Sequence, residues 1–132
     1  MNEEEAFVRA FVVKAKQARL VELLASPKRR RDVTATLPHF RDLDPRFIVR
    51  LPSDGHDSES IVRALRLRGA DDTCHVISEH RNLDGQRLPL ASALDQIVGS
   101  GMGTLVSCIP AALGYFEDEE GRDRWILARA AT

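Results

Sequence analysis

The chain has 132 residues, of which 43% are hydrophobic and 30% are charged, and this ordinary globular composition excludes an intrinsically disordered chain. No stretch reaches the roughly 18 consecutive apolar residues of a transmembrane helix, and the two cysteines provide no disulfide framework. The acidic N-terminus does not resemble a secretory signal. The sequence therefore predicts a cytoplasmic protein with one domain over residues 1–132.

The net charge of −1 conceals an asymmetry along the chain. Residues 1–50 contain 11 Lys or Arg and 7 Asp or Glu, whereas residues 51–132 contain 8 and 13. Such a chain either docks an anionic partner through its first third or pairs its own two halves within the fold. We therefore distinguish a basic helical segment, 1–45, from an α/β core, 46–132.

The first predicted helix spans residues 3–25, where apolar side chains recur at every third or fourth position. Glutamates at positions 3–5 favour a helix start, because negative charge stabilises the N-terminal end of a helix dipole. The apolar cluster at 11–13 leaves an alternative, in which a short extended piece precedes a helix that starts at Lys14.

A second helix is predicted from Pro27 to about Leu37. Ser26 is a typical capping residue, and proline fits the first helical position, where no backbone N–H is needed. Pro38 marks the end of this helix, and Leu43-Asp44-Pro45 predicts a turn.

Beyond residue 45, predicted strands alternate with helices. This order predicts an α/β fold with α+β character: an N-terminal helical pair, a right-handed β-α-β-α-β core and a C-terminal antiparallel β-hairpin. Glu117 to Glu120, in the acidic hairpin tip, are predicted to be solvated. The predicted strands are 46–51, 73–78, 104–109, 113–116 and 124–128, and the two helices between them begin at Asp57 or Ser58 and at Pro89.

The run Lys28-Arg29-Arg30-Arg31 is the first candidate site. In the predicted helix these cations fall in the first turn and a half, where positive charge opposes the helix dipole at about 0.3–1 kcal/mol per exposed residue. Their position favours a use in binding. Four successive helical residues cannot share one face, so solvation or pairing with the chain's own carboxylates is the alternative. The candidate anion-binding residues are Lys14, Lys16, Arg19, Lys28, Arg29, Arg30 and Arg31.

A second candidate site follows from the predicted parallel strands, because open α/β sheets bind ligands at the carboxyl ends of such strands. Glu79, His80 and Arg81 follow one predicted strand, and Cys108 lies near the end of the next. A carboxylate, an imidazole, a guanidinium and a thiol in one neighbourhood suit a small enzyme or a ligand-binding domain. The alternative is that Cys108 is a small buried hydrophobic residue.

Two further patterns predict no site. Gly99-x-Gly101-x-Gly103 follows a helix and precedes a strand, the reverse of a phosphate-binding loop, so these glycines are interpreted as a helix stop. The four histidines have no standard metal-ligand spacing, and the sequence predicts neither a metal site nor a cofactor.

Three segments together resemble a small bacterial domain family of unknown function. They are Ser26-Pro27-Lys28-Arg29-Arg30, His39-Phe40-Arg41-Asp42-Leu43-Asp44-Pro45-Arg46 and Cys108-Ile109-Pro110. The resemblance implies no activity, ligand or partner.

The leading hypothesis is a non-catalytic binding or regulatory module whose basic N-terminal face contacts RNA or an acidic protein surface. One alternative is a small enzyme or ligand sensor at the second candidate site. Another is an interaction protein whose C-terminal hairpin forms the edge of a homodimer. No membrane contact is predicted, and the oligomeric state stays open.

Overall fold

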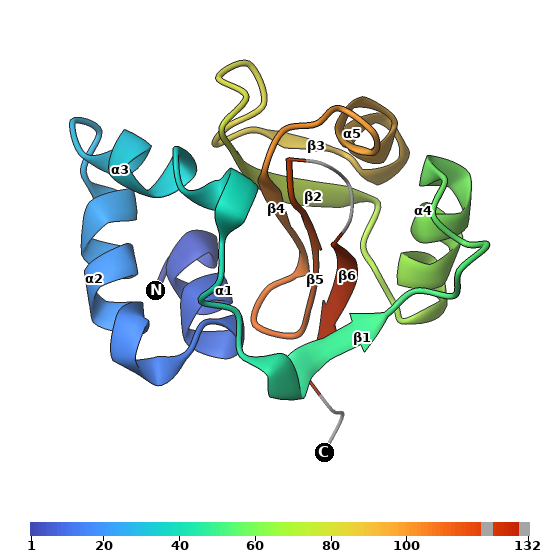
Figure 1. Ribbon diagram of the computed structural model, residues 1–132, viewed down its shortest axis with the longest axis horizontal. Coiled ribbons are helices and arrows are strands. Elements are labelled where there is room, and N and C mark those ends of the chain that lie inside the picture. The colour runs from blue at the N-terminus through green and yellow to red at the C-terminus, as the bar shows by residue number, and fades with distance from the viewer. Residues whose placement is uncertain (120–122, 130–132) are drawn as a thin grey trace.

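The computed structural model describes residues 1–119 and 123–129, which form a six-stranded sheet flanked by helices (Figure 1). Glu120, assigned above to the hairpin tip, lies outside the described residues. The strands follow the order β1-β6-β5-β4-β2-β3, and each neighbouring pair is antiparallel. Their bounds are β1 Ile48–Arg50, β2 Thr73–Ser78, β3 Arg87–Pro89, β4 Thr104–Ile109, β5 Leu113–Glu117 and β6 Arg124–Ala128.

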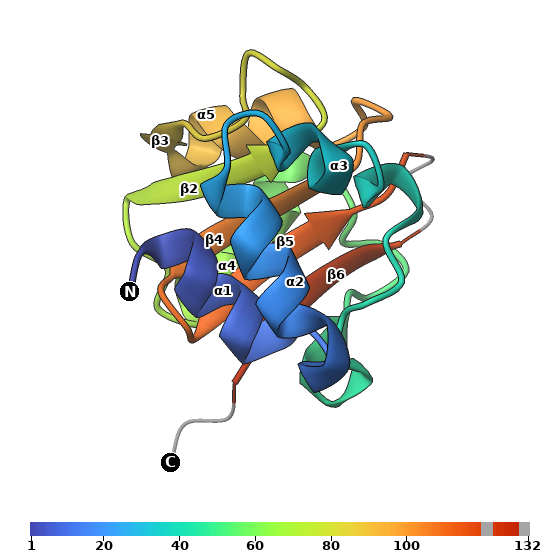
Figure 2. The ribbon, with the colours of Figure 1, turned by 90° about the vertical axis from the view of Figure 1, so that its left-hand side faces the viewer.

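Helices cover both faces of this sheet. Figure 2 shows α1, α2 and α3 in front of the strands, with α4 and α5 behind them. No described helix is both long enough and apolar enough to cross a bilayer. The predicted α+β class is confirmed. The bounds are α1 Glu3–Phe11, α2 Lys14–Ala25, α3 Arg30–Thr34, α4 Ser58–Leu67 and α5 Leu90–Ile97, with the 3-10 turns η1 Leu37–His39 and η2 Pro45–Phe47.

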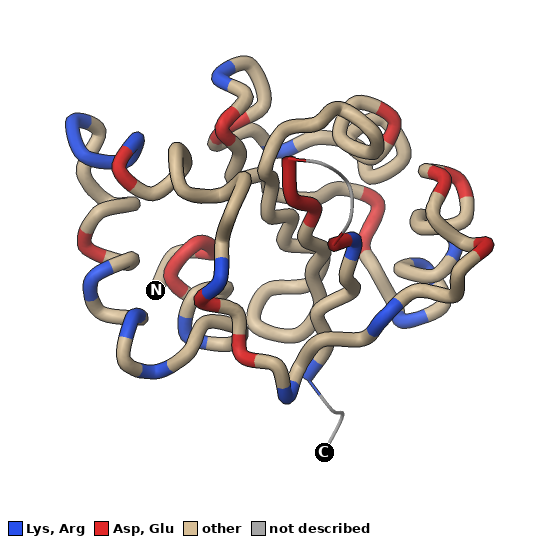
Figure 3. The backbone as a smooth tube through the Cα atoms, in the orientation of Figure 1, with Lys and Arg blue, Asp and Glu red and all other residues tan. Residues whose placement is uncertain are grey.

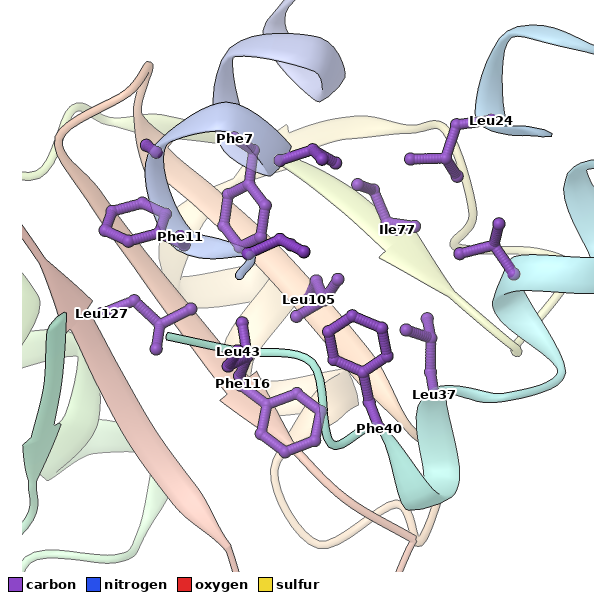
Figure 4. Packing of buried hydrophobic residues seen from close by; sticks show 14 of the residues in the cluster. Phe7, Phe11, Leu24, Leu37, Phe40, Leu43, Ile77, Leu105, Phe116 and Leu127 are labelled. Carbon is purple, nitrogen blue, oxygen red and sulfur yellow. The ribbon is translucent and has the colours of Figure 1, made fainter. Parts of the chain in front are cut away.

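The sheet separates two hydrophobic cores, because successive residues of a strand point to opposite faces. On β4, Leu105 lies in the core beneath α1 to α3, whereas Val106 lies in the core beneath α4 and α5. The first core contains aromatic side chains, and the rings of Phe7 and Phe11 meet edge to face at 5.1 Å (Figure 4). Each fully buried side chain of this size stabilises the fold by about 1.5–3 kcal/mol.

The expectation of parallel strand ends was wrong, and one short strand is the cause. The sequence predicts no strand at β3, where only Pro89 is assigned, to a helix start, but β3 pairs antiparallel with β2 and reverses the chain once more. After α5, the chain therefore enters β4 antiparallel to β2, with His75 opposite Ser107 and Ser78 opposite Thr104.

The N-terminal segment is helical as predicted, but the first predicted helix, 3–25, is divided into α1 and α2 where the β-branched residues lie, and α2 begins at Lys14 as in the alternative. Val12 and Val13 are extended between α1 and α2, and Val12 forms an isolated antiparallel bridge with Leu43. The N–H of Val13 donates to the Asp42 carbonyl at 2.8 Å. The Val12 N–H still donates to the Val8 carbonyl at 3.0 Å, so pairing with the later segment begins at the Val13 N–H.

The second predicted helix is much shorter than expected. Ser26 is the C-cap of α2 and not the start of a new helix, and the chain turns through Pro27 before α3 begins at Arg30. Lys28 and Arg29 thus precede α3, so only Arg30 and Arg31 of the four cations lie in its first turn.

The C-terminal hairpin is confirmed, but it lies inside the sheet and not at its edge. β5 and β6 pair with each other, and β1 covers the outer side of β6, so the hairpin offers no free edge for a homodimer. Glu117 was predicted to be solvated, but it is fully buried. It accepts hydrogen bonds from the Tyr115 hydroxyl at 2.8 Å and the Gly99 N–H at 2.9 Å.

The glycines after α5 act as the predicted helix stop. Gly99 and Gly101 have positive φ angles, which few other residues tolerate. Gly103 has a different role, since a Cβ atom there would lie 2.3 Å from the Leu37 carbonyl carbon and the Pro38 nitrogen. The close approach of η1 to the start of β4 therefore requires glycine at this position.

Candidate anion-binding site

The predicted cationic residues follow one side of the molecule. In Figure 3 blue segments run along α2 and continue around α3. All of the seven except Arg30 are exposed. We call the exposed set the basic edge: Lys14, Lys16, Arg19, Lys28, Arg29 and Arg31.

Arg30 is different, because its guanidinium is held inside the molecule. It donates to both oxygens of Glu4 at 2.6 Å and to both oxygens of Asp84 at 2.6 and 2.9 Å. The Arg30 side chain is only 19% exposed. These contacts join α3 to α1 and to the β2–β3 connection, so Arg30 has a structural role.

Glu4 carries this network onto the sheet. Its Oε2 lies 2.7 Å from Nε2 of His75 on β2. Burial opposes ionisation of Glu4, but its hydrogen bonds with His75 and Arg30 and the positive charge of Arg30 outweigh it and hold its pKa at about 2. Glu4 is therefore ionised at neutral pH and fastens α1 to β2.

Glu3 makes a parallel set of contacts. Ser107 on β4 donates to Glu3 at 2.7 Å, and Arg87 on β3 forms an ion pair with the same carboxylate. The Asn2 side chain caps α1 by accepting from the Glu5 N–H at 2.8 Å, which fixes where the helix begins. The first turn of α1 thus serves as a polar attachment to three strands.

The remaining basic residues have weak partners or none. Arg29 lies 3.8 Å from Glu22 and 3.9 Å from Asp32, and Arg19 lies 3.8 Å from Glu22. Exposed pairs of this kind contribute at most about 1 kcal/mol. Within 1–119 and 123–129, no carboxylate lies at ion-pair distance from Lys14, Lys16, Lys28 or Arg31.

A pocket of about 260 Å³ opens between α3 and the β2–β3 connection. It unites part of each predicted site, since Arg31 lines it from α3 and Glu79 and Arg81 line it from the other side. We call it the arginine pocket. Its lining residues are Pro27, Arg30, Arg31, Thr34, Ser78, Glu79, Arg81 and Asp84.

Two cations of the arginine pocket are available to a ligand. Arg31 and Arg81 are both exposed, and no described carboxylate pairs with Arg81. Asp84 is already engaged by Arg30. Burial and the nearby charge of Glu119 raise the pKa of Glu79 above its usual value.

The Ser78 hydroxyl at the pocket wall is held in place. It lies 2.8 Å from the Thr104 hydroxyl and accepts from the His80 N–H at 3.0 Å. His80 is half-buried, and its Nδ1 accepts from the Asn82 N–H at 3.2 Å. His80 therefore shapes the β2–β3 connection next to the pocket.

Cys108 does not join Glu79, His80 and Arg81. Because β2 and β4 are antiparallel, Cys108 lies toward the end of β4 that faces the start of β2, away from Ser78. The thiol is 2% exposed, and burial raises its pKa. The expectation of a thiol in this neighbourhood was wrong, and its alternative, a buried hydrophobic residue, describes Cys108.

Sequence reasoning missed Glu4, His75 and Asp84, the three partners that organise this region. Glu4 carries only the signal of an acidic helix start, and Asp84 lies in the run Asn82-Leu83-Asp84-Gly85, whose residue types are typical of a turn. Glu4 lies 26 positions from Arg30 and 71 from His75, and Asp84 lies 54 positions from Arg30, so no local spacing reveals these contacts. Within the described part of the chain, no three His, Cys, Asp or Glu side chains are placed to hold a metal ion.

Comparison with known proteins adds no assignment: no protein-family model matches the chain, and neither a curated protein nor a solved structure matches it.

Proposed function

We propose that this protein is a non-catalytic binding module that holds an acidic segment of a protein partner along the basic edge and in the arginine pocket. One observation carries the proposal. Arg31 and Arg81 come from different segments, line the same pocket and have no carboxylate partner among the described residues. Two unpaired guanidiniums at one concave site favour a bound carboxylate, because each guanidinium can donate two parallel hydrogen bonds.

The basic edge extends this site along the molecule. Lys28 stands unpaired beside the pocket segment, and the long contacts of Arg19 and Arg29 with Glu22 are weak enough to be exchanged for a partner's carboxylates. Arg30 takes no part in binding, since Glu4 and Asp84 occupy its donors.

A protein partner fits the surface better than RNA. Binding of single-stranded RNA uses exposed rings next to cations, on which bases stack. Phe40 is buried, and Phe47 is covered by the guanidinium of Arg129 at 4.2 Å from its centroid. Both rings are therefore engaged within the fold.

The test is a salt series with labelled probes. A glutamate-rich peptide and single- and double-stranded RNA of equal charge are titrated with the protein, and fluorescence anisotropy reports binding. We expect the peptide to bind and its affinity to fall as salt rises from about 50 to about 200 mM. The double variant Lys28→Glu/Arg31→Glu should bind at least tenfold more weakly.

The matched control is Arg66→Glu/Arg68→Glu, which reverses two exposed cations at the end of α4. It should leave the affinity unchanged. No binding at about 50 mM salt, or an equal loss in both double variants, would refute the proposal. If either RNA binds more tightly than the peptide, the partner class is nucleic acid and not an acidic protein segment.

A second candidate function is the binding of a small anion in the arginine pocket alone. The pocket's volume of about 260 Å³ suits one carboxylate or phosphate group and favours this reading. Citrate or inorganic phosphate should then raise the melting temperature of the wild type and leave that of Arg81→Ala unchanged. Equal shifts in both proteins would exclude a small-anion site.

A further inference from the structure

A second pocket lies at the opposite side of the first core, where the segment after η1 passes over β1 and β6. It measures about 420 Å³, and we call it the tryptophan pocket. Phe40 is buried in its wall, and Ile48 and Trp125 are half-buried there. Its walls combine these apolar side chains with charged ones, among them Arg41 and Arg50, and its volume is typical of a binding site.

The tryptophan pocket lies against an open sheet edge. β1 pairs only with β6, and among residues 1–119 and 123–129 none outside β6 hydrogen-bonds to the backbone of Val49 or Arg50. An edge strand of this kind is a template for another extended chain. Ile48 and Arg50 are two positions apart and line the pocket, so they share one face of the strand.

The charged residues at the pocket determine which side chains an added strand can place there. Arg50 is exposed, its guanidinium lies 5.8 Å from the centroid of the Trp125 ring, and no described carboxylate pairs with it. Arg41 lines the same pocket and is also unpaired within the described residues. Asp118 and Asp123 line the hairpin side, so the pocket walls carry side chains of both charge signs.

We propose that the open edge of β1 takes up an extended peptide as an additional strand, with a large apolar side chain beside Ile48 and an acidic side chain two positions away beside Arg50. Cross-strand neighbours on one face interact directly, so Ile48 selects an apolar partner and Arg50 an acidic one. Backbone hydrogen bonds supply affinity in this mode of recognition, and the alternate side chains supply specificity. The site shares no residue with the basic edge or the arginine pocket, and it stands independently of the function proposed above.

The experiment selects peptides from a random display library with the wild-type protein. We expect enrichment of sequences in which an acidic and a large apolar residue are separated by one position. A selected peptide is then titrated in solution. Trp125 is the only tryptophan of the chain, so a change in its fluorescence reports occupation of this pocket.

Two comparisons make the test specific. Arg50→Glu should weaken the selected peptide at least tenfold, whereas the matched control Arg68→Glu should leave its affinity unchanged. The same peptide with methylated backbone nitrogens should also bind at least tenfold more weakly, because strand addition needs its N–H donors. This second comparison uses the wild-type protein and does not depend on the folding of a variant.

Three results would overturn the inference. One is the absence of enriched peptides, and another is undiminished binding by Arg50→Glu. The third is that the methylated and unmodified peptides bind equally well and that phenylacetate changes the Trp125 fluorescence. That result would identify a small-molecule pocket and exclude strand addition.

Discussion

At Arg30, one guanidinium is shared by two carboxylates, Glu4 and Asp84, which belong to α1 and to the β2–β3 connection. Arg31, the next residue of α3, is exposed and has no such partner among the described residues. The two neighbours therefore differ in what their removal would leave behind. Loss of Arg30 leaves the largely buried carboxylates of Glu4 and Asp84 without their shared guanidinium. Loss of Arg31 leaves no carboxylate without a partner.

We predict that Arg30→Ala lowers the free energy of unfolding by about 3–5 kcal/mol, which is the typical cost of removing one partner of a buried ion pair. Arg31→Ala should change it by less than about 0.5 kcal/mol, as exposed substitutions usually do. Urea denaturation followed by circular dichroism measures both. Equal effects of the two substitutions would show that the network contributes nothing to stability.

The pKa of Glu4 predicts an acid-sensitive fold. Because the folded-state pKa of about 2 lies below the ordinary 4.5, ionised Glu4 stabilises the fold above pH 4.5, and this contribution is lost as the pH falls toward 2. After allowance for solvent screening the contribution is on the order of 2 kcal/mol.

Unfolding free energies of the wild type and Glu4→Gln should therefore differ at pH 7 and converge near pH 2. A difference that stays constant over this interval would contradict an ionised Glu4 in the fold.

Single residues also show where sequence reasoning ends. Residues 28–31 are four similar cations in a row, and their local pattern supports binding and internal pairing alike. The fold selects Arg30 for pairing, because only its side chain lies between α1 and the β2–β3 connection. Partners 26 and 54 positions away decide this outcome, and no nearby residue signals them.

Among the elements, η1 and β4 approach each other so closely that only glycine fits at position 103. We predict that Gly103→Ala lowers the free energy of unfolding by more than about 2 kcal/mol, because the new methyl group would overlap the backbone of Leu37 and Pro38. Gly55→Ala is the control, since its Cβ would lie at an ordinary 3.6 Å from Pro52. Thermal unfolding of both variants provides the measurement, and an equally stable Gly103→Ala would contradict the described packing.

Elements with strong local signals could be predicted from the sequence. The strands 73–78, 104–109 and 124–128 were found at their observed bounds, because each is rich in β-branched or aromatic residues. β3 has only three residues, one of them proline, and gives no such signal. Missing it reversed the expected direction of every later strand, which is why a site built on parallel strand ends was misplaced.

At the scale of the whole molecule, the reactivity of the two thiols measures how often the second core, which lies beneath α4 and α5, is exposed to solvent. Cys74 and Cys108 are both buried there, burial raises the pKa of Cys74 to about 11, and the same cause raises that of Cys108. We predict that neither thiol reacts with an alkylating reagent at pH 8 until the protein unfolds, and that both rates rise with urea as global unfolding does. Fast modification of either thiol without urea would show that this core opens locally.

The first core has a consequence for synthesis on the ribosome. Phe7 and Phe11 lie against Leu105, Phe116 and Leu127, which are translated about 100 residues later. At a translation rate of about 5–20 residues per second, the apolar side of α1 is synthesised roughly 5–20 s before these strands. A nascent chain stalled before β4 therefore exposes an amphipathic helix without its binding surface, and this is the stage at which a chaperone has most to protect.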